Sequence, residues 1–305
     1  MKARKLPSVL ASNVVSYPEM NLSIIIPAYN EENTISSIIE GLQKSLASIP
    51  NLTHEIIVID DGSADGTREV LDVIPNIKVV RHHFNKGYGA AIKTGIEQAS
   101  HNWLLLFDAD GQARSEEIPK LLVHADDYSM VVGARIKKYS PWIRTPGRAL
   151  LHFLANYLAS QKIPDINSGF RLVKKESVRQ FWHLLPSTYS LSTTITLAFI
   201  QSGLEIKYVP IHINPRTGGN SGVRPRHALQ MFFLILRTIT LFSPLRVFMP
   251  VALGLFSLAS ISLTYDIIHI HITNSTVLLF ITSVIIFLFG ILADQLSTIR
   301  REMKP

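Results

Sequence analysis

Two long uncharged segments near the C-terminus most constrain what this chain can fold into. Residues 247–265 and 275–293 are each 19 residues long and contain no Asp, Glu, Lys or Arg. At a rise of 1.5 Å per residue, each would form a helix of about 28 Å, close to the hydrocarbon thickness of a bilayer. We therefore expect two transmembrane helices within residues 244–299. The alternative is a pair of buried core helices, which two adjacent uncharged runs of this length disfavour.

Basic residues flank these segments, whereas residues 266–274 between them contain no Lys or Arg. The flanking basic residues are Arg237, Arg246, Arg300, Arg301 and Lys304. By the positive-inside rule, both flanks then lie in the cytoplasm. The N-terminal arm, residues 1–20, is basic but lacks the apolar core of a signal peptide. We therefore expect an integral membrane protein whose large N-terminal domain, N-terminus and tail at 300–305 are cytoplasmic.

Composition narrows the classes of function. Of 305 residues, 47% are hydrophobic and 17% charged, so the chain is not intrinsically disordered. Its 30 Lys and Arg against 23 Asp and Glu give a net charge of +7, which favours anionic partners such as lipid headgroups or nucleotides. Nucleic acid is disfavoured because the basic residues are scattered or cluster near the expected membrane. The lack of cysteine excludes disulfides, thiolate metal sites and cysteine nucleophiles.

The stretch before the first uncharged segment, residues 225–243, combines apolar residues with nearby arginines, and Pro225 and Pro244 bracket it. This pattern predicts an amphipathic helix that lies on the lipid headgroups. A solvent-facing helix packed on the globular domain would have the same pattern, so both interpretations stay open.

Between residues 21 and 224, short β-rich runs alternate with helical patterns, which predicts an α/β domain. We expect strands at 22–27, 55–59, 78–81, 103–107, 130–133 and 206–211. We expect helices at 34–47, 67–73, 89–99, 116–124 and 193–201, the first with Asn33 as its N-cap. Because the strands are almost continuously apolar, the sheet should be mainly parallel and covered by helices on both faces. Ligands of such sheets bind beyond the C-terminal ends of the strands.

Three of the expected strands end in acidic motifs. These are Tyr29-Asn30-Glu31-Glu32, Asp60-Asp61-Gly62-Ser63 and Asp108-Ala109-Asp110-Gly111-Gln112. Asp108 and Asp110 can both face a hard cation such as Mg²⁺ or Mn²⁺, with a nucleoside diphosphate supplying further oxygens. Each motif alone could be a turn or a helix cap, but three on one rim favour a nucleotide-diphosphate site. No Gly-x-Gly-x-x-Gly or Walker A motif supports a nicotinamide or P-loop site.

Together with Asn85-Lys86-Gly87-Tyr88-Gly89-Ala90-Ala91, these motifs resemble the family 2 glycosyltransferases. The resemblance implies a GT-A (Rossmann-like) domain at 21–224 that uses a nucleotide-sugar donor. Within the family, the chain is most similar to the polyprenyl-phosphate (dolichol-phosphate-type) transferases, some of which also carry two C-terminal transmembrane helices. The matching motifs are Gly133-Ala134-Arg135, Asp165-Ile166-Asn167-Ser168-Gly169-Phe170-Arg171, Val209-Pro210-Ile211 and Arg216-Thr217-Gly218-Gly219-Asn220-Ser221.

The resemblance implies roles for individual residues. Those matching the nucleotide site are Pro27, Tyr29, Glu31, Asp60, Asp61, Lys86, Gly87 and Asp108. Those matching the metal and diphosphate site are Asp108, Asp110 and Gln112. Catalysis would rest on Asp110 and on Arg135 and Arg148, the two arginines binding the acceptor phosphate. The acceptor side and a mobile loop over the diphosphate would include Ser168, Arg171, Arg216, Ser221 and Arg224. Arg171 could instead be a structural ion-pair partner, and Gly222 stands where many relatives have Lys.

These features predict inverting transfer of a single sugar from a UDP- or GDP-sugar to polyprenyl phosphate at the cytoplasmic membrane face. Because the acceptor is already an anion, no strong general base is required. One alternative is transfer to a hydroxyl of a lipid or glycan, with Asp110, Asp165 or Glu205 as the base. Another is a membrane-tethered protein that binds sugar nucleotides without turnover. The sequence leaves open the sugar, the nucleotide, the polyprenol and whether a homo-oligomer forms.

Overall fold

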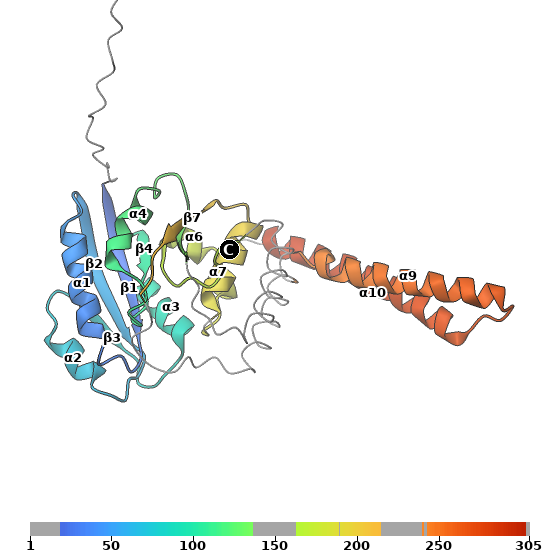
Figure 1. The fold of residues 1–305 in the computed structure, drawn as a ribbon, viewed down its shortest axis with the longest axis horizontal. Helices are drawn as coiled ribbons and strands as arrows, with labels where there is room; N and C mark the ends of the chain where they lie inside the picture. Colours follow the sequence, from blue (N-terminus) through green and yellow to red (C-terminus); the bar gives the residue numbers. More distant parts are fainter. Residues whose placement is uncertain (1–18, 137–162, 189, 215–239, 241–242, 303–305) are drawn as a thin grey trace, which may run out of the picture.

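The computed structural model describes residues 19–136, 163–188, 190–214, 240 and 243–302, which form a sheet domain followed by a helical hairpin (Figure 1). The sheet has seven strands in the order β3-β2-β1-β4-β6-β5-β7. The strands are β1 Met20–Ala28, β2 Leu52–Asp60, β3 Lys78–Arg81, β4 Trp103–Leu106, β5 Met130–Arg135, β6 Arg171–Lys174 and β7 Ile206–Ile211. Neighbouring strands are parallel except at β6, which confirms the expected mainly parallel sheet.

Strand β6 is a difference from the expected sheet. It lies between β4 and β5 and is antiparallel to both, with Arg171 opposite Leu106 and Val132. Its four residues include only two apolar ones, Leu172 and Val173, which is too short a run for a hydrophobic period to be read. Because β6 runs against its neighbours, its first residue lies at the edge of the sheet where β4 and β5 end.

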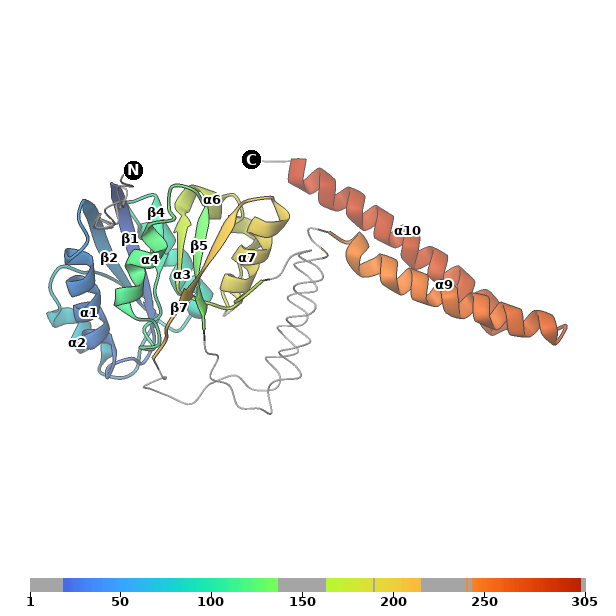
Figure 2. The same cartoon turned by 45° about the horizontal axis from the view of Figure 1, so that its top comes forward.

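Helices cover both faces of the sheet, as expected (Figure 2). On one face lie α1 Ile35–Ala47, α2 Thr67–Val73 and α4 Ile118–Leu122, which follows a short 3-10 turn, η1 Ser115–Glu117. On the other face lie α3 Tyr88–Gln98, α6 Lys175–Arg179 and α7 Leu191–Gln201. Side chains alternate along each strand, so Ile24 and Ile26 pack under α1 whereas Ile25 packs under α3. Helix α1 begins one residue later than expected, with Thr34 rather than Asn33 at its N-cap.

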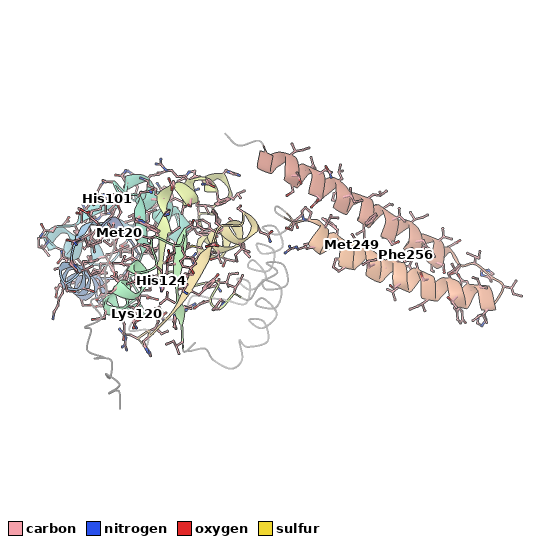
Figure 3. The ribbon with its side chains drawn as sticks, turned by 90° about the horizontal axis from the view of Figure 1, so that it is seen from above. Met20, His101, Lys120, His124, Met249 and Phe256 are labelled. Carbon is pink, nitrogen blue, oxygen red and sulfur yellow. The ribbon has the colours of Figure 1, made fainter. Side chains whose placement is uncertain are left out.

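The C-terminal part forms a hairpin of two long helices, α9 Leu245–Ile268 and α10 Asn274–Glu302. They contain both expected spans and extend beyond them. Only 11% of the most apolar stretch of α9 and 17% of that of α10 is buried, so these are not core helices of the sheet domain. Edge-on ring pairs hold them together, Phe248 against Phe289 and Phe256 against Phe280. Figure 3, which labels Phe256, shows the hairpin extending away from the sheet.

One described contact joins the sheet domain to the start of the hairpin. The Ser243 hydroxyl donates to Oε1 of Gln201, the last residue of α7, at 2.9 Å. Apart from Thr240 and Ser243, the amphipathic helix expected at 225–243 lies outside the described residues, as do residues 1–18 of the arm.

Candidate active site

The loops after β1 and β2 are bonded to each other. The backbone N–H of Asn30 donates to the Ser63 hydroxyl at 3.1 Å, and the Asn30 side-chain oxygen accepts from the N–H of Ala64 at 2.8 Å. The N–H of Glu31 donates to the Thr67 hydroxyl at 2.8 Å. Asn30 has a φ of +56°, a left-handed conformation that asparagine tolerates. These bonds fix the rim of the sheet where the nucleotide residues are expected.

Asp60, at the end of β2, is completely buried and lacks one hydrogen bond. Its Oδ1 accepts from the N–H of Ser63 at 2.9 Å. Among the described residues, its Oδ2 has no hydrogen-bond partner, and Nε of Arg68 lies 3.8 Å away. A buried carboxylate oxygen without a donor is uncommon in folded proteins. It fits a ligand that brings an N–H donor, such as a nucleobase, and Tyr29 nearby in the interlocked loops is 44% exposed.

Asp61 uses both carboxylate oxygens to hold the next loop in place. The N–H groups of Lys86 and Gly87 donate to its Oδ1 and Oδ2 at 2.9 and 2.8 Å. Nδ1 of the buried His82 donates to Oδ1 at 2.6 Å, and Nε2 of that ring is 2.9 Å from the Thr94 hydroxyl. Asp61, which the resemblance assigns to the nucleotide site, thus positions the loop that carries Lys86 and Gly87.

Replacing Asp61 with alanine should destabilise the domain and weaken donor binding, because it leaves two backbone N–H groups and His82 without their acceptor. Each unsatisfied buried group costs about 1–3 kcal/mol. We expect a lower melting temperature and a roughly tenfold higher Kd for the nucleotide, measured by calorimetry. Asp72→Ala is the matched control, because Asp72 is 58% exposed and pairs with Arg81 at the surface. Equal effects of the two substitutions would contradict this role of Asp61.

The acidic motif after β4 is packed from two sides. The Tyr88 hydroxyl, at the start of α3, donates to Oδ1 of Asp108 at 2.8 Å. On the other side, a Cβ atom added to Gly169 would lie 2.1 Å from Oδ2 of Asp108. Desolvation and the neighbouring Asp110 raise the pKa of Asp108 to about 6. The carboxylate is therefore crowded, desolvated and close to a second negative charge, a situation that a bound cation relieves.

The loop around Asp110 is tied to the segment that follows β7. Gly111 has a φ of +72°, and the N–H of Gln112 donates to Oδ1 of Asp110 at 3.0 Å. The N–H of Asn214 donates to the Gln112 carbonyl at 2.9 Å, and its side-chain oxygen accepts from Nε of Arg114 at 2.6 Å. The chain thus enters the expected mobile loop directly beside the acidic motif.

Arg135, at the end of β5, forms a two-point ion pair with Asp165. Nε donates to Oδ2 at 2.6 Å and Nη2 donates to Oδ1 at 2.9 Å. The Asp165 side chain is only 3% exposed and that of Arg135 is 23% exposed. This pairing fixes the plane of the guanidinium group and leaves Arg135 partly accessible at the same edge of the sheet as Asp108.

Ser168 and Arg171, which the resemblance assigns to the acceptor side, are both buried. The Ser168 hydroxyl donates to the Gly133 carbonyl at 2.7 Å. Arg171 is fully buried and donates to the carbonyls of Ser168 and Ser192 and to the Thr196 hydroxyl. Within the described chain, no carboxylate forms a salt bridge with it, so the ion-pair alternative is not observed. Arg171 instead joins β6 to α7.

The structure brings most of the other expected site residues to one edge of the sheet. Pro27, Tyr29, Asp60 and Asp61 lie at the ends of β1 and β2, and Glu31 accepts from the Thr34 hydroxyl at 2.8 Å. Four of the expected residues, Arg148, Arg216, Ser221 and Arg224, lie outside the described part of the chain.

Three contributors to the site were not identified from the sequence: Tyr88, Gly169 and the pairing of Asp165 with Arg135. Tyr88 and Gly169 both stand inside motifs that the resemblance used, so their presence in those motifs was the only available signal. Their contacts with Asp108 join residues 20 and 61 positions apart, which local patterns cannot reveal.

The two carboxylates of the site fit a divalent cation that is bound partly by the protein and partly by a substrate diphosphate. Among the described residues, no cluster of three or more His, Asp or Glu could hold a metal ion alone. Asp108 and Asp110 supply two carboxylates, and Mg²⁺ is commonly bound by one or two carboxylates together with substrate phosphates. Such a pair would therefore hold a metal only weakly until a diphosphate completes its coordination.

Comparison with known proteins identifies relatives over both parts of the chain. Residues 23–182 match the model of glycosyl transferase family 2, and residues 243–299 match the GtrB C-terminal hairpin. The dolichyl-phosphate beta-glucosyltransferase of Drosophila melanogaster is 31% identical over 188 residues, covering 54% of this chain and 58% of that protein. The undecaprenyl-phosphate 4-deoxy-4-formamido-L-arabinose transferase of Proteus mirabilis is 29% identical over 163 residues, covering 52% and 50%. The chain thus spans little more than half the length of these two transferases.

Solved structures share the fold of the sheet domain. Glucosyl-3-phosphoglycerate synthase from Mycobacterium tuberculosis, crystallised with Mn²⁺ and UDP-glucose, superposes with a TM-score of 0.59 at 19% identity, covering 72% of this chain and 79% of that one. The family 2 model itself matches 160 of 305 residues, from the first strand through the acidic motif to residue 182. This chain therefore belongs to glycosyl transferase family 2, and a GtrB C-terminal hairpin follows its family 2 domain.

Proposed function

We propose that this protein transfers a single sugar from a UDP- or GDP-sugar to polyprenyl phosphate at the cytoplasmic face of a membrane, with inversion at C1. One observation carries the proposal: a single chain joins a crowded Asp108–Asp110 site at the sheet edge to a hairpin of two helices that are long and apolar enough to cross a membrane. The two transferase relatives, whose names specify dolichyl and undecaprenyl phosphate, support the acceptor class. The product would be a polyprenyl-phosphate-linked sugar for glycan assembly.

The donor would lie along the edge formed by β1, β2 and β4. The unpaired Oδ2 of Asp60 accepts from the base, and the loop held by Asp61 brings Lys86 to the nucleotide. Asp108 and Asp110 hold the divalent cation, with Gln112 beside them. When bound, Mg²⁺ or Mn²⁺ neutralises the charge of the departing diphosphate. Tyr88 and Gly169 keep the Asp108 carboxylate in the orientation that this requires.

The acceptor would approach from the side of β5. Arg135, oriented by Asp165, binds the phosphate of the lipid through its remaining N–H groups, and Arg148 assists. A phosphate oxygen forms the bond to C1 of the sugar as the bond from C1 to the nucleoside diphosphate breaks. No proton has to be removed from the acceptor, so the site needs positioning and charge rather than a base. Closure over the diphosphate would involve Arg216, Ser221 and Arg224.

The structure offers little support for transfer to a hydroxyl. Of the three candidate bases, Asp165 is buried and paired with Arg135. Glu205 directly precedes β7 and therefore lies at the opposite end of the sheet from Asp108. Asp110 remains, but it is needed for the cation.

The decisive experiment is transfer to a polyprenyl phosphate in detergent, using radiolabelled UDP- and GDP-sugars with Mg²⁺ or Mn²⁺. We expect a labelled lipid with one donor, lost on adding EDTA and in Asp110→Asn. Donor hydrolysis without labelled lipid would favour a hydroxyl acceptor. Donor binding without hydrolysis or transfer would favour a protein that only binds sugar nucleotides.

Cation binding should depend on pH because the pKa of Asp108 is about 6. A raised folded-state pKa means that ionising Asp108 costs stability as the pH rises through about 6, in the metal-free protein. Mn²⁺ compensates this cost only when Asp108 is ionised. We therefore expect Mn²⁺, added together with UDP or GDP, to raise the melting temperature more at about pH 7.5 than at about pH 5.5.

Tyr88→Phe provides the matched variant for this pH dependence. The Tyr88 hydroxyl lowers the pKa of Asp108, so its removal should move the acid limb of Mn²⁺ binding to higher pH. An Mn²⁺ effect of equal size at both pH values, in both proteins, would contradict the role assigned to Asp108.

A further inference from the structure

The turn between α9 and α10 exposes apolar side chains at its apex. Ile267, Ile268, Ile270 and Ile272 are 65%, 71%, 94% and 64% exposed. Turns on the surface of a protein in water usually carry Gly, Pro, Asn, Asp or Ser instead. Apolar side chains are also exposed on both helices, where Ile261 and Leu278 are 68% and 65% exposed.

Three polar side chains at the ends of the same turn, Asp266, Thr273 and Thr276, bond to one another, whereas His269 and His271 are exposed. Asp266 is only 2% exposed. Its Oδ2 accepts from the N–H and the hydroxyl of Thr273 at 2.8 and 3.0 Å and from the hydroxyl of Thr276 at 2.6 Å. The Thr276 hydroxyl also lies 2.5 Å from that of Ser262 on α9. The acidic side chain thus closes the hairpin and begins α10 without contacting the surroundings.

Backbone donors of the turn are also satisfied internally. The N–H groups of His269, Ile270 and His271 donate to the carbonyls of Tyr265, Ile267 and Asp266, at 3.1, 3.2 and 3.0 Å. Internal bonding of these N–H groups and of Asp266 suits a place where water is scarce, because an unsatisfied backbone group is costly in lipid.

Ile270 at the apex adopts a left-handed backbone conformation with a φ of +53°. This conformation is unfavourable for a β-branched residue, and Gly or Asn would adopt it at lower cost. An isoleucine at this position therefore needs a compensating contact. None of the described residues covers it, since its side chain is 94% exposed.

We propose that the apex, residues 267–272, is embedded in the far leaflet of the membrane and contacts acyl chains near the headgroups. This proposal rests on the membrane anchorage of the proposed function. At 1.5 Å per residue, the 24-residue helix α9 is about 36 Å long, somewhat longer than a hydrocarbon core of about 30 Å. The apex then reaches the boundary of the acyl chains, where isoleucines contact lipid and the two histidines lie among the headgroups.

The absence of cysteine from the chain makes a site-specific test direct. Ile270→Cys would be labelled with an environment-sensitive NBD fluorophore in the full-length protein in lipid nanodiscs, which leave both membrane faces accessible. Two controls share its high exposure: Ile261→Cys within α9, and Val73→Cys on α2, where Val73 is 80% exposed. We expect blue-shifted emission at 270 and 261, quenched by spin-labelled lipid and not by iodide. The label at 73 should be quenched by iodide alone.

The outcomes separate this proposal from the anchorage on which it depends. If the label at 270 behaves like that at 73 while 261 remains in lipid, the apex lies in water and the proposal is wrong. If 270 is shielded from both quenchers, a protein surface or a second copy covers the apex, which also overturns it. If 261 is quenched by iodide as well, the hairpin is not in the membrane and the proposed function loses its anchor.

Discussion

Replacing Gly169 with alanine should abolish sugar transfer. The new Cβ atom would lie 2.1 Å from Oδ2 and 2.7 Å from Cγ of Asp108, which no real contact tolerates. The Asp108 carboxylate would have to move away, and it is held on its other side by the Tyr88 hydroxyl. A displacement of about 1 Å in a catalytic group can cost 100-fold in rate, so we expect at least this loss.

Two quantities should be measured, the rate of sugar transfer and the affinity for Mn²⁺ in the presence of UDP or GDP, because a displaced Asp108 should impair both. Gly254→Ala in α9 is the matched control, since a Cβ there meets nothing within 4 Å. A Gly169→Ala protein that keeps Mn²⁺ affinity and transfers sugar within a few fold of the unmodified protein would show that Asp108 does not hold the cation.

Replacing Asp165 with alanine should have the largest effect on stability. It leaves the Arg135 guanidinium largely buried without its partner, and breaking a buried pair in this way costs about 3–5 kcal/mol. For a domain of this size, the melting temperature should fall by on the order of 10 °C. The same change should weaken polyprenyl-phosphate binding more than donor binding, because only Arg135 loses its orientation.

Asp72→Ala again serves as the control for the melting temperature, since it breaks the exposed pair with Arg81 and exposed ion pairs contribute about 0–1 kcal/mol to stability. Asp165→Asn adds a second test, because the amide keeps the shape of the carboxylate but removes its charge. Its melting temperature should lie between those of Asp165→Ala and the unmodified protein. A melting temperature of Asp165→Ala within 2 °C of the unmodified protein would refute the structural importance of this pair.

Much of the fold could be predicted because its elements carry strong local patterns. The apolar runs of β1, β2 and β4 and the uncharged spans of α9 and α10 are long enough to read directly. Strand β6 could not be predicted, because four residues with a charged residue at each end show no period. It becomes a strand only through pairing with β4 and β5.

The edge of the sheet that carries the acidic motifs was predictable, whereas the contacts of the side chains there were less so. The rule that ligands bind at the C-terminal ends of parallel strands placed the acidic motifs correctly along one edge. The direction of each side chain, however, depends on partners distant in sequence. Asp61 faces residues 25 and 26 positions away, and Arg171 faces Thr196. A motif identifies such residues without indicating whether they contact a ligand or support the residues that do.

The antiparallel direction of β6 also bears on how members of this fold could diversify. The chain leaves β5 at Arg135 and returns toward β6 at Asp165. These two residues form an ion pair, in which Nε and Oδ2 are 2.6 Å apart. Whatever length or sequence lies between them, its two ends are fixed to the same point of the scaffold. A change of length or sequence between residues 136 and 164 should therefore leave the sheet, the edge that carries the acidic motifs and the hairpin in place.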